Sequence, residues 1–230
     1  MVMEIEVKIA DPEFVAGVLV AAEVRVAPTP PTLALRNALH RTDELLRHPN
    51  GEFPTAAVKD AIRDMLRKGG FRPAGRNKPA SEYLAQAARE GRFPRINNLV
   101  DVINLLALES GLPISLLDLN AVGPSAEIRY GREGEKYVFN ASGQELDLAG
   151  LICVCRTDPA ASTPLGSPIK DSMAGKITDQ TTGVLAVIYG STRAIDEPAM
   201  ESLLVEFGQL MEQYATTKQT ERQVLRGAAA

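Results

Sequence analysis

The sequence has few of the residue types on which metal sites, disulfides and base-stacking surfaces depend. It contains two cysteines, two histidines and no tryptophan, and aromatic residues make up 5% of its 230 positions. Cys153 and Cys155 lie two apart on an expected strand, where the extended backbone keeps the two thiols from bridging each other easily. Two cysteines are also too few for a disulfide framework or a cysteine-based zinc site. We therefore expect neither a metal nor a cofactor, and the scarcity of aromatics argues against a stacking platform for single strands.

Long hydrophobic runs are also missing. The apolar stretch from Phe14 to Ala22 ends at Glu23 and is far shorter than the roughly 18 to 20 residues that cross a bilayer. Glu4 and Glu6 stand where a secretory signal would carry Lys or Arg. With 45% apolar residues the chain can still bury a substantial core, which excludes disorder as a class. The sequence predicts a cytoplasmic protein that does not enter a membrane.

Charge is distributed unevenly along the chain. The net charge is −4, but residues 59–95 carry ten Lys and Arg against four Asp and Glu, so this segment is +6 and the remainder is −10. Such a surface suits the phosphates of a nucleic acid, because neutralising them releases counterions and steers association. A solvated helix face with charges paired along the helix explains the same pattern. The candidates for phosphate contacts, if they are not simply solvent-exposed, are Arg76, Lys78, Arg92 and Arg95.

Hydrophobic periodicity divides the chain into strands and helices without a βαβ alternation. Strands are predicted over residues 3–9, 14–26, 128–130, 137–139, 151–156 and 184–189. Helices are predicted over residues 33–48, 54–67, 81–91, 198–214 and from Asn97 or Asn98 to Gly111. This mixed order predicts an α+β fold. We expect N-terminal strands and a helical pair packed on the core (1–70), a main domain (71–215) and a frayed tail (216–230).

A family resemblance starts in the helix that begins at Asn97 or Asn98. The chain reads Arg95-Ile96-Asn97-Asn98-Leu99-Val100-Asp101-Val102-Ile103-Asn104, then Glu109-Ser110-Gly111-Leu112-Pro113-Ile114 and Leu117-Asp118-Leu119. These runs resemble the motifs N-N-x-V-D-x-T-N-Y and L-E-x-G-Q-P-x-H-A-F-D of the B3/B4 editing domain of the phenylalanyl-tRNA synthetase beta subunit. Residues 128–135 and 176–184 resemble later segments of that domain, and residues 71–95 resemble the lead-in of free-standing B3/B4 proteins. The resemblance implies a B3/B4-like domain with mixed β-sheets packed with helices, preceded by an N-terminal strand and helical segment.

The activity that the resemblance implies is hydrolysis, in trans, of the ester that joins a wrong amino acid to the terminal ribose of a tRNA. An aminoacyl ester is already activated, so a pocket that positions water and hydrogen-bond donors around the carbonyl can suffice. A separate editing pocket is needed because one small group gives only about 1 to 3 kcal/mol of discrimination at the charging site. The implied partner is tRNA or aminoacyl-tRNA.

Individual positions both match the family pattern and depart from it. Asn104 matches the Asn of T-N-Y that lies in the family's editing pocket, whereas Ile103 replaces the neighbouring Thr. Ser115 stands where the family has a His, and Val187 where it has the Glu that recognises a tyrosine hydroxyl. Valine cannot accept that hydrogen bond, and an unpaired buried hydroxyl costs roughly 1 to 3 kcal/mol. We therefore expect the pocket to take an amino acid other than tyrosine, or no amino acid.

Asn104 and Ser115 are the candidate catalytic residues. A serine nucleophile needs an adjacent base, and both histidines, His40 and His48, belong to the N-terminal helical segment, so we expect Ser115 to position water instead. The candidate substrate-binding residues are Asn98, Asp101, Ser167, Lys170, Asp171, Thr181 and Val187. Structural roles remain open for several of them: a helix cap for Asn98, a brace on the Arg95 loop for Asp101, an exposed turn for Lys170 and Asp171, and closure of a turn for Thr181.

Two other classes of function fit the same sequence. The altered His and Glu positions and the acidic net charge favour a non-catalytic B3/B4 module that binds tRNA, a free amino acid or a related small metabolite. A protein-interaction domain assembled through the N-terminal helical pair is a third interpretation. The sequence does not define the oligomeric state.

Overall fold

A computed structural model of the protein describes residues 3–30, 53–158 and 161–229, and these residues form an α+β fold. Its strands are β1 (Glu4–Val7), β2 (Phe14–Ala22), β3 (Ile114–Asp118), β4 (Ser125–Tyr130), β5 (Lys136–Val138), β6 (Glu145–Asp147), β7 (Ile152–Asp158), β8 (Ala161–Gly166), β9 (Gly183–Ser191) and β10 (Gln219–Arg226). Its helices are α2 (Ala56–Lys68), α3 (Ala80–Arg89), α4 (Asn98–Ser110), α5 (Leu119–Val122) and α6 (Glu197–Ala215), with 3-10 turns over Gly75–Asn77 and Met173–Gly175. The predicted fold class is confirmed.

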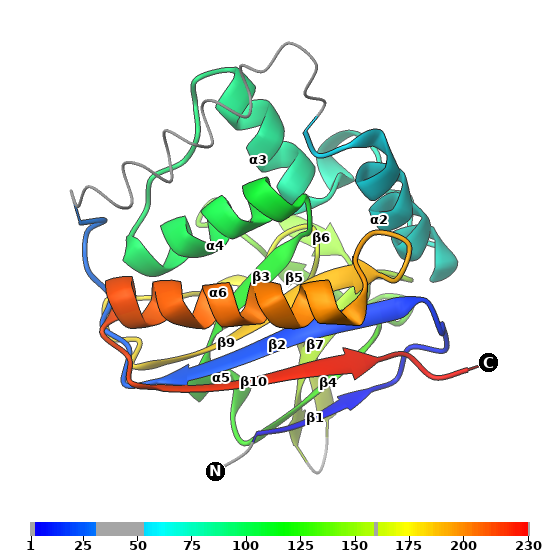
Figure 1. The fold of residues 1–230 in the computed structure, drawn as a ribbon. Helices are drawn as coiled ribbons and strands as arrows, with labels where there is room; N and C mark the ends of the chain where they lie inside the picture. The colour runs from blue at the N-terminus through cyan, green and yellow to red at the C-terminus, as the bar shows by residue number, and fades with distance from the viewer. Residues whose placement is uncertain (1–2, 31–52, 159–160, 230) are drawn as a thin grey trace.

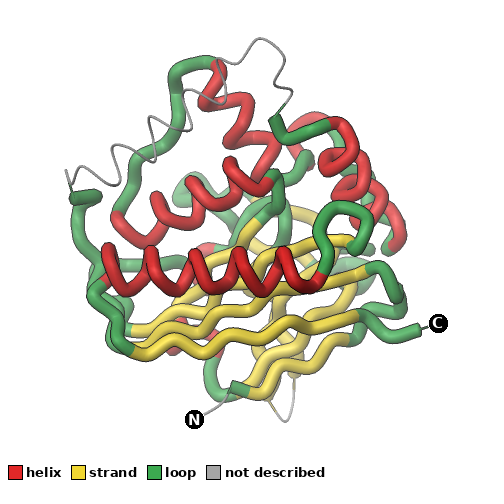
Figure 2. Tube along the Cα trace, viewed as in Figure 1, coloured by secondary structure: helices red, strands yellow, loops and turns green. Residues whose placement is uncertain are grey.

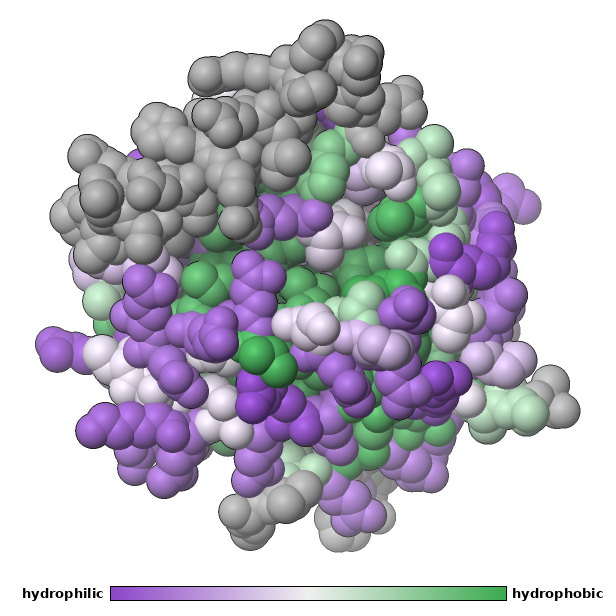
Figure 3. All heavy atoms as spheres, viewed as in Figure 1, coloured by the Kyte–Doolittle hydropathy of each residue, from purple (hydrophilic) through white to green (hydrophobic). Residues whose placement is uncertain are grey.

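Two four-stranded sheets make up most of the β structure. Their strand orders are β1-β4-β7-β8 and β10-β2-β9-β3, and β5 pairs with β6 in a separate ribbon. The β1–β4 pair is parallel, whereas the other named pairs are antiparallel. Figures 1 and 2 show α3, α4 and α6 on one side of the sheet that contains β2 and β9. Figure 3 shows the same face as largely hydrophilic, with apolar side chains gathered where α4 and α6 run.

The helix that carries the family motif has clear local signals at both ends. The side chain of Asn97 caps α4 by accepting a hydrogen bond from the backbone nitrogen of Val100 at 2.9 Å. Gly111 ends α4 in the left-handed region, with φ of 74°, a conformation that favours glycine. A Cβ on Gly111 would also come within 2.5 Å of Pro54 Cβ. The position of this helix therefore follows directly from its sequence.

Strand β9 explains the buried character of its sheet. Every residue from Gly183 to Ser191 is buried, and β9 lies between β2 and β3 in the sheet. Its apolar run is typical of a strand that is covered on both faces. Since β2 comes from residues 1–70 and β9 from residues 71–215, one sheet joins the two predicted segments.

The structure corrects the predicted ends of the chain. Residues 216–230 are not a frayed tail, because Gln219–Arg226 form β10, which pairs along its whole length with β2. The strand predicted over 14–26 stops at Ala22. The sequence patterns also missed β3, β6 and β8. The predicted helix over 33–48 lies outside the described residues, so the helical pair is represented by α2 alone.

No helix in the described part of the chain is long and apolar enough to span a membrane.

Candidate functional site

A cavity of about 680 Å³ lies between α3, the N-terminal half of α4 and the loop that follows β8. Asn104 and Val100 line it from α4, where residues four apart share one face of the helix. Arg76, Lys78 and Arg92 line it from the segments on either side of α3. Lys170 and Ile169 reach it from the loop after β8. The cavity thus brings together one of the predicted catalytic residues, three of the four predicted phosphate contacts and Lys170.

Asn104 presents a polar group to this cavity. Its side chain is partly buried and makes no hydrogen bond to any residue that the structure describes. An amide in such a setting retains two N–H donors and a carbonyl acceptor for a bound molecule. The neighbouring Ile103 is buried at 7% exposure. Asn104 is therefore the helix residue best placed to contact a ligand.

The charges around the cavity are of one sign. Among its lining residues in the described ranges, four are Arg or Lys and none is Asp or Glu. Burial lowers the pKa of Lys170, and the nearby charge of Arg76 lowers it further. The ammonium of Lys170 also lies 4.0 Å from the centre of the Phe139 ring, a cation–π contact. This arrangement favours an anionic group in the cavity.

Ser115 belongs to a buried network next to the cavity and does not line it. Ser115 is 0% exposed, and its Oγ donates to Asp171 Oδ1 at 2.6 Å. The hydroxyl of Tyr189 lies 2.8 Å from the same Oγ. The other oxygen of Asp171 accepts from the backbone nitrogen of Leu116 at 3.0 Å. The network holds the loop after β8 against β3.

The same network fixes the turn that carries Lys170. Ser167 Oγ donates to the carbonyl of Lys170 at 2.9 Å, and the hydroxyl of Tyr137 also donates to that carbonyl. The backbone nitrogen of Ser167 donates to Asp171 Oδ1 at 3.2 Å. Ser167 and Asp171 therefore hold the turn that carries Lys170, whereas the sequence suggested that they contact the substrate.

Burial changes the proton affinity of the groups in this network. It raises the pKa of Asp171 to about 6, although hydrogen bonds from Ser115, Leu116 and Ser167 oppose the shift. Burial, followed by the charge of Asp171, raises the pKa of Tyr189 well above its usual range. Asp171 is thus the group of the network that titrates closest to neutral pH.

Replacing Asp171 with asparagine is expected to remove a pH dependence of stability. Because its folded-state pKa of about 6 lies above the ordinary value of 3.8, the folded state binds this proton more tightly than the unfolded state. The resulting stabilisation is complete below about pH 4 and is lost as the pH rises to about 6, an effect of at most about 3 kcal/mol. Denaturant unfolding across this range should show the wild type losing stability relative to Asp171→Asn. Parallel curves would contradict the assignment, and Asp147→Asn, at an exposed carboxylate, is the control.

Asn98 and Asp101 have structural contacts. Asn98 is not the cap of α4, because its side chain accepts from the backbone nitrogen of Ala27 at 2.8 Å and donates to the carbonyls of Arg25 and Tyr214 at 2.9 and 2.7 Å. Asp101 accepts from Thr29 Oγ1 and from the backbone nitrogen of Ile96 at 2.8 Å. Neither side chain lines the cavity. Asn98 therefore has a structural role other than the predicted cap, and the contacts of Asp101 favour its structural alternative, a brace on the loop that precedes α4.

Three further predicted site residues lie outside the cavity lining. Thr181 donates to Asp118 Oδ2 at 2.5 Å and closes a turn by accepting from the nitrogen of Thr178. Val187 is fully buried on β9, opposite Ser115 in the strand register. Arg95 is exposed on the loop before α4. The cavity therefore unites only part of the predicted site.

The sequence interpretation missed the apolar residues that complete the cavity. Tyr83 and Leu84 line it from α3, and Ile96 lines it from the loop before α4. Tyr83 and Ile96 are 55% and 60% exposed. Tyr83 and Leu84 occupy helical positions and Ile96 belongs to the motif, so all three resembled ordinary packing residues in the sequence. Tyr137 and Tyr189 of the buried network carried no local signal.

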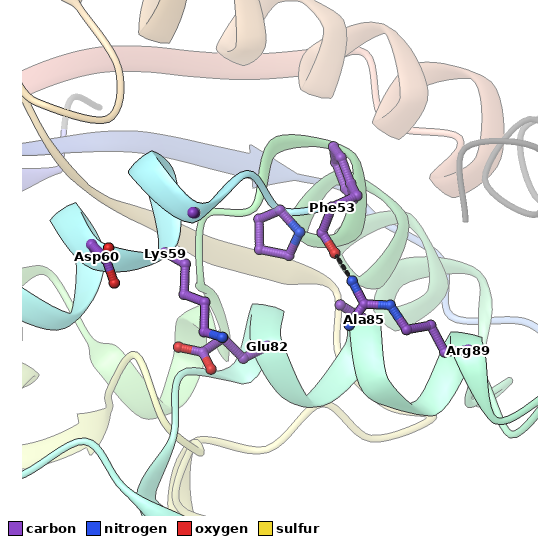
Figure 4. A pocket seen from close by; sticks show the side chains of 8 residues that line it. Phe53, Lys59, Asp60, Glu82, Ala85 and Arg89 are labelled. Carbon is purple, nitrogen blue, oxygen red and sulfur yellow. Dashed lines mark hydrogen bonds between the residues drawn. The ribbon is translucent and has the colours of Figure 1, made fainter. Parts of the chain in front are cut away.

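A second hollow, of about 370 Å³, lies between α2 and α3 and is shown in Figure 4. It mixes charges of both signs, since Lys59 and Arg89 line it together with Asp60 and Glu82. Arg89 donates to the carbonyl of Phe53 at 2.6 Å, the dashed line in Figure 4. Glu82 is already held by Arg63 through two bonds of 2.7 Å. These contacts are those of helix packing.

Metal binding has no structural support in the residues described. Across 3–30, 53–158 and 161–229, no group of three or more His, Cys, Asp or Glu is placed to hold a metal ion. Cys153 and Cys155 are buried free thiols, and burial raises the pKa of both.

Comparison with known proteins connects this cavity to a family. The chain is 30% identical over 132 residues to the phenylalanine–tRNA ligase beta subunit of Pseudomonas syringae pv. syringae, a match of 57% of this chain and 15% of the relative. It is 35% identical over 86 residues to the corresponding subunit of Carboxydothermus hydrogenoformans, covering 36% of this chain and 11% of that one. The chain thus matches only a small part of these relatives.

A solved structure is also similar. It is an N-terminal fragment of the phenylalanyl-tRNA synthetase beta subunit from Pyrococcus horikoshii, with 13% identity and a TM-score of 0.37 over 90% of this chain and 51% of the fragment. The B3/4 domain pattern matches residues 67–214, which include α3, α4 and the loop after β8. These residues supply the whole lining of the cavity. The chain belongs to the B3/4 domain family.

Proposed function

We propose that this protein hydrolyses, in trans, the ester of a mischarged aminoacyl-tRNA. The observation that carries the proposal is the cavity of about 680 Å³, which Asn104 lines together with four Arg or Lys, and in which the Asn104 side chain makes no hydrogen bond to another described residue. An ester-linked amino acid at the end of an RNA offers a carbonyl for the amide and phosphates for the cations. The family membership supports the same kind of substrate.

Hydrolysis of an activated ester depends more on positioning the ester and the attacking water than on a nucleophilic side chain. Ser115 is fully buried and engaged with Asp171, so we assign the attack to water and not to a serine. Asn104 would orient the ester carbonyl or the attacking water through its amide. The turn held by Ser167 and Asp171 would keep Lys170 against the cavity. Each of these roles acts on an ester that is already activated.

A panel of correctly and incorrectly charged tRNAs tests this proposal. Ester release from one of them should fall about 100-fold in Asn104→Ala, a loss typical of removing one positioned hydrogen-bond donor. Asn120→Ala, which changes an exposed asparagine outside the cavity, is the matched control and should retain full activity. Thermal melting of each variant separates loss of activity from loss of folding. No release from any ester, or release that is unchanged in Asn104→Ala, would overturn the proposal.

The second candidate is a non-catalytic module that binds tRNA or a small molecule. It is favoured by the burial of Ser115, which leaves Asn104 as the one predicted catalytic residue among the described residues that line the cavity. A receptor for a free amino acid or metabolite would show a higher melting temperature with that ligand and no effect of tRNA.

A further inference from the structure

The mouth of the cavity exposes two large apolar side chains. Four such side chains are exposed in the described part of the chain, namely Tyr83, Ile96, Val138 and Val205. Tyr83 at 55% and Ile96 at 60% are the two most exposed of them, and both line the cavity. Single exposed apolar residues are ordinary, but two that meet at one hollow mark a binding surface. The cavity therefore offers a flat aromatic ring and an aliphatic side chain to an occupant.

Both side chains stand on backbone that is held in place. Tyr83 lies in the first turn of α3, whose start is tied to the loop after β8 by a hydrogen bond from Ala80 N to Pro168 O at 2.9 Å. Ile96 is fixed through its backbone nitrogen, which donates to Asp101 Oδ1 at 2.8 Å. Binding to a surface that is already ordered loses less conformational entropy.

The cations beside these two residues are available to an anion. Lys78 donates to the neutral amide of Gln86, and Arg76 has no ion pair with any described residue. Arg92 pairs with Glu90, a residue that does not line the cavity. A phosphate suits this wall, because the described residues that line the cavity include four Arg or Lys and no carboxylate. A flat apolar group with a phosphate attached matches both parts.

We propose that Tyr83 and Ile96 hold the base of one nucleotide at the mouth of the cavity while Arg76, Lys78 and Arg92 contact its phosphate. Base stacking on an aromatic ring accepts any base, and the cations supply the affinity for the backbone. One exposed tyrosine serves one base, which is consistent with the low aromatic content of the chain. The inference rests on the proposed function, in which that nucleotide is the terminal one of an RNA and its ester enters the cavity.

Equilibrium binding of two probes tests the site: the ribotrinucleotide CpCpA with a free 3′ hydroxyl, and AMP. Both should bind, and Tyr83→Leu should weaken both by about 10-fold or more, the usual effect of removing one stacked aromatic. Tyr83→Phe should bind as the wild type does, because the ring and not the hydroxyl makes the contact. Val205→Ala, which removes exposed apolar surface from α6, is the control and should change nothing.

The two probes also distinguish the source of the nucleotide. Tighter binding of CpCpA than of AMP, with competition by tRNA, indicates an RNA end, whereas equal binding without competition indicates a free nucleotide. Unchanged affinity in a folded Tyr83→Leu variant overturns the inference. If CpCpA binds through Tyr83 but no aminoacyl ester is hydrolysed, the nucleotide site stands and the proposed function fails. If esters are hydrolysed and Tyr83→Leu leaves KM unchanged, the proposed function stands and the nucleotide site fails.

Discussion

Replacing Arg129 with methionine is expected to lower the free energy of unfolding by about 3 to 5 kcal/mol, the usual cost of removing one partner from a buried ion pair. The side chain of Arg129 is 6% exposed. Its two terminal nitrogens each donate to a carboxylate oxygen of Glu135 at 2.8 Å, and Nε donates to Glu127 at 3.0 Å. Without the guanidinium, the side chains of Glu127 and Glu135, at 4% and 21% exposure, lose their shared partner.

The pKa directions agree with this reasoning. Hydrogen bonds to Arg129 lower the pKa of Glu135, although burial opposes the shift. Glu127 keeps one cation in the variant, because Lys8 donates to it at 2.7 Å. The loss should therefore fall mainly on Glu135, and adding Glu135→Gln to Arg129→Met should recover part of the stability.

Denaturant unfolding at neutral pH measures both effects. Arg67→Met is the matched control, because Arg67 pairs with Asp64 at a surface where its side chain is 54% exposed, and such pairs contribute at most about 1 kcal/mol. If Arg129→Met lowers the free energy of unfolding no more than Arg67→Met does, the buried carboxylates do not depend on Arg129 for their stability.

Neutralising Arg76, Lys78 and Arg92 together with glutamine is expected to weaken tRNA binding by about 100-fold at 0.1 M salt. Each phosphate contact adds about 0.7 to the slope of log affinity against log salt for single strands, so three contacts contribute a slope of about 2. All three residues line one cavity, which places their charges on one side of a bound strand. The salt dependence of the variant should be flatter by the same amount.

Binding curves at several salt concentrations provide the measurement. A control with Lys136, Arg193 and Arg226 changed to glutamine removes the same charge from exposed ion pairs outside the cavity. Equal losses in the two triple variants would mean that net charge, and not this surface, holds the RNA. Arg95→Gln, at the predicted contact that does not line the cavity, should have a smaller effect than any one of the three.

The sequence by itself determined the features that depend on neighbouring residues and on composition. The capping Asn97 and the terminal Gly111 define α4, and the motif between them identifies the family and includes Asn104. The apolar run over residues 184–189 predicted a strand, and the clustering of Lys and Arg over 59–95 predicted a cationic surface. Local sequence suffices for these, since caps, periodicity and charge act within a few residues.

Only the tertiary structure decided which of these residues meet. Asp101 and Asn104 are three apart on one helix, yet Asp101 turns to Thr29 and Ile96 while Asn104 faces the cavity. Residues 219–226 are polar enough to suggest a tail, but β2 offers them a free edge and they pair with it across about 200 residues of sequence. Ser115 and Asp171 are 56 positions apart and 2.6 Å from each other. Contacts of this kind leave no local pattern, because the partner of each group is chosen by the packing of the whole chain.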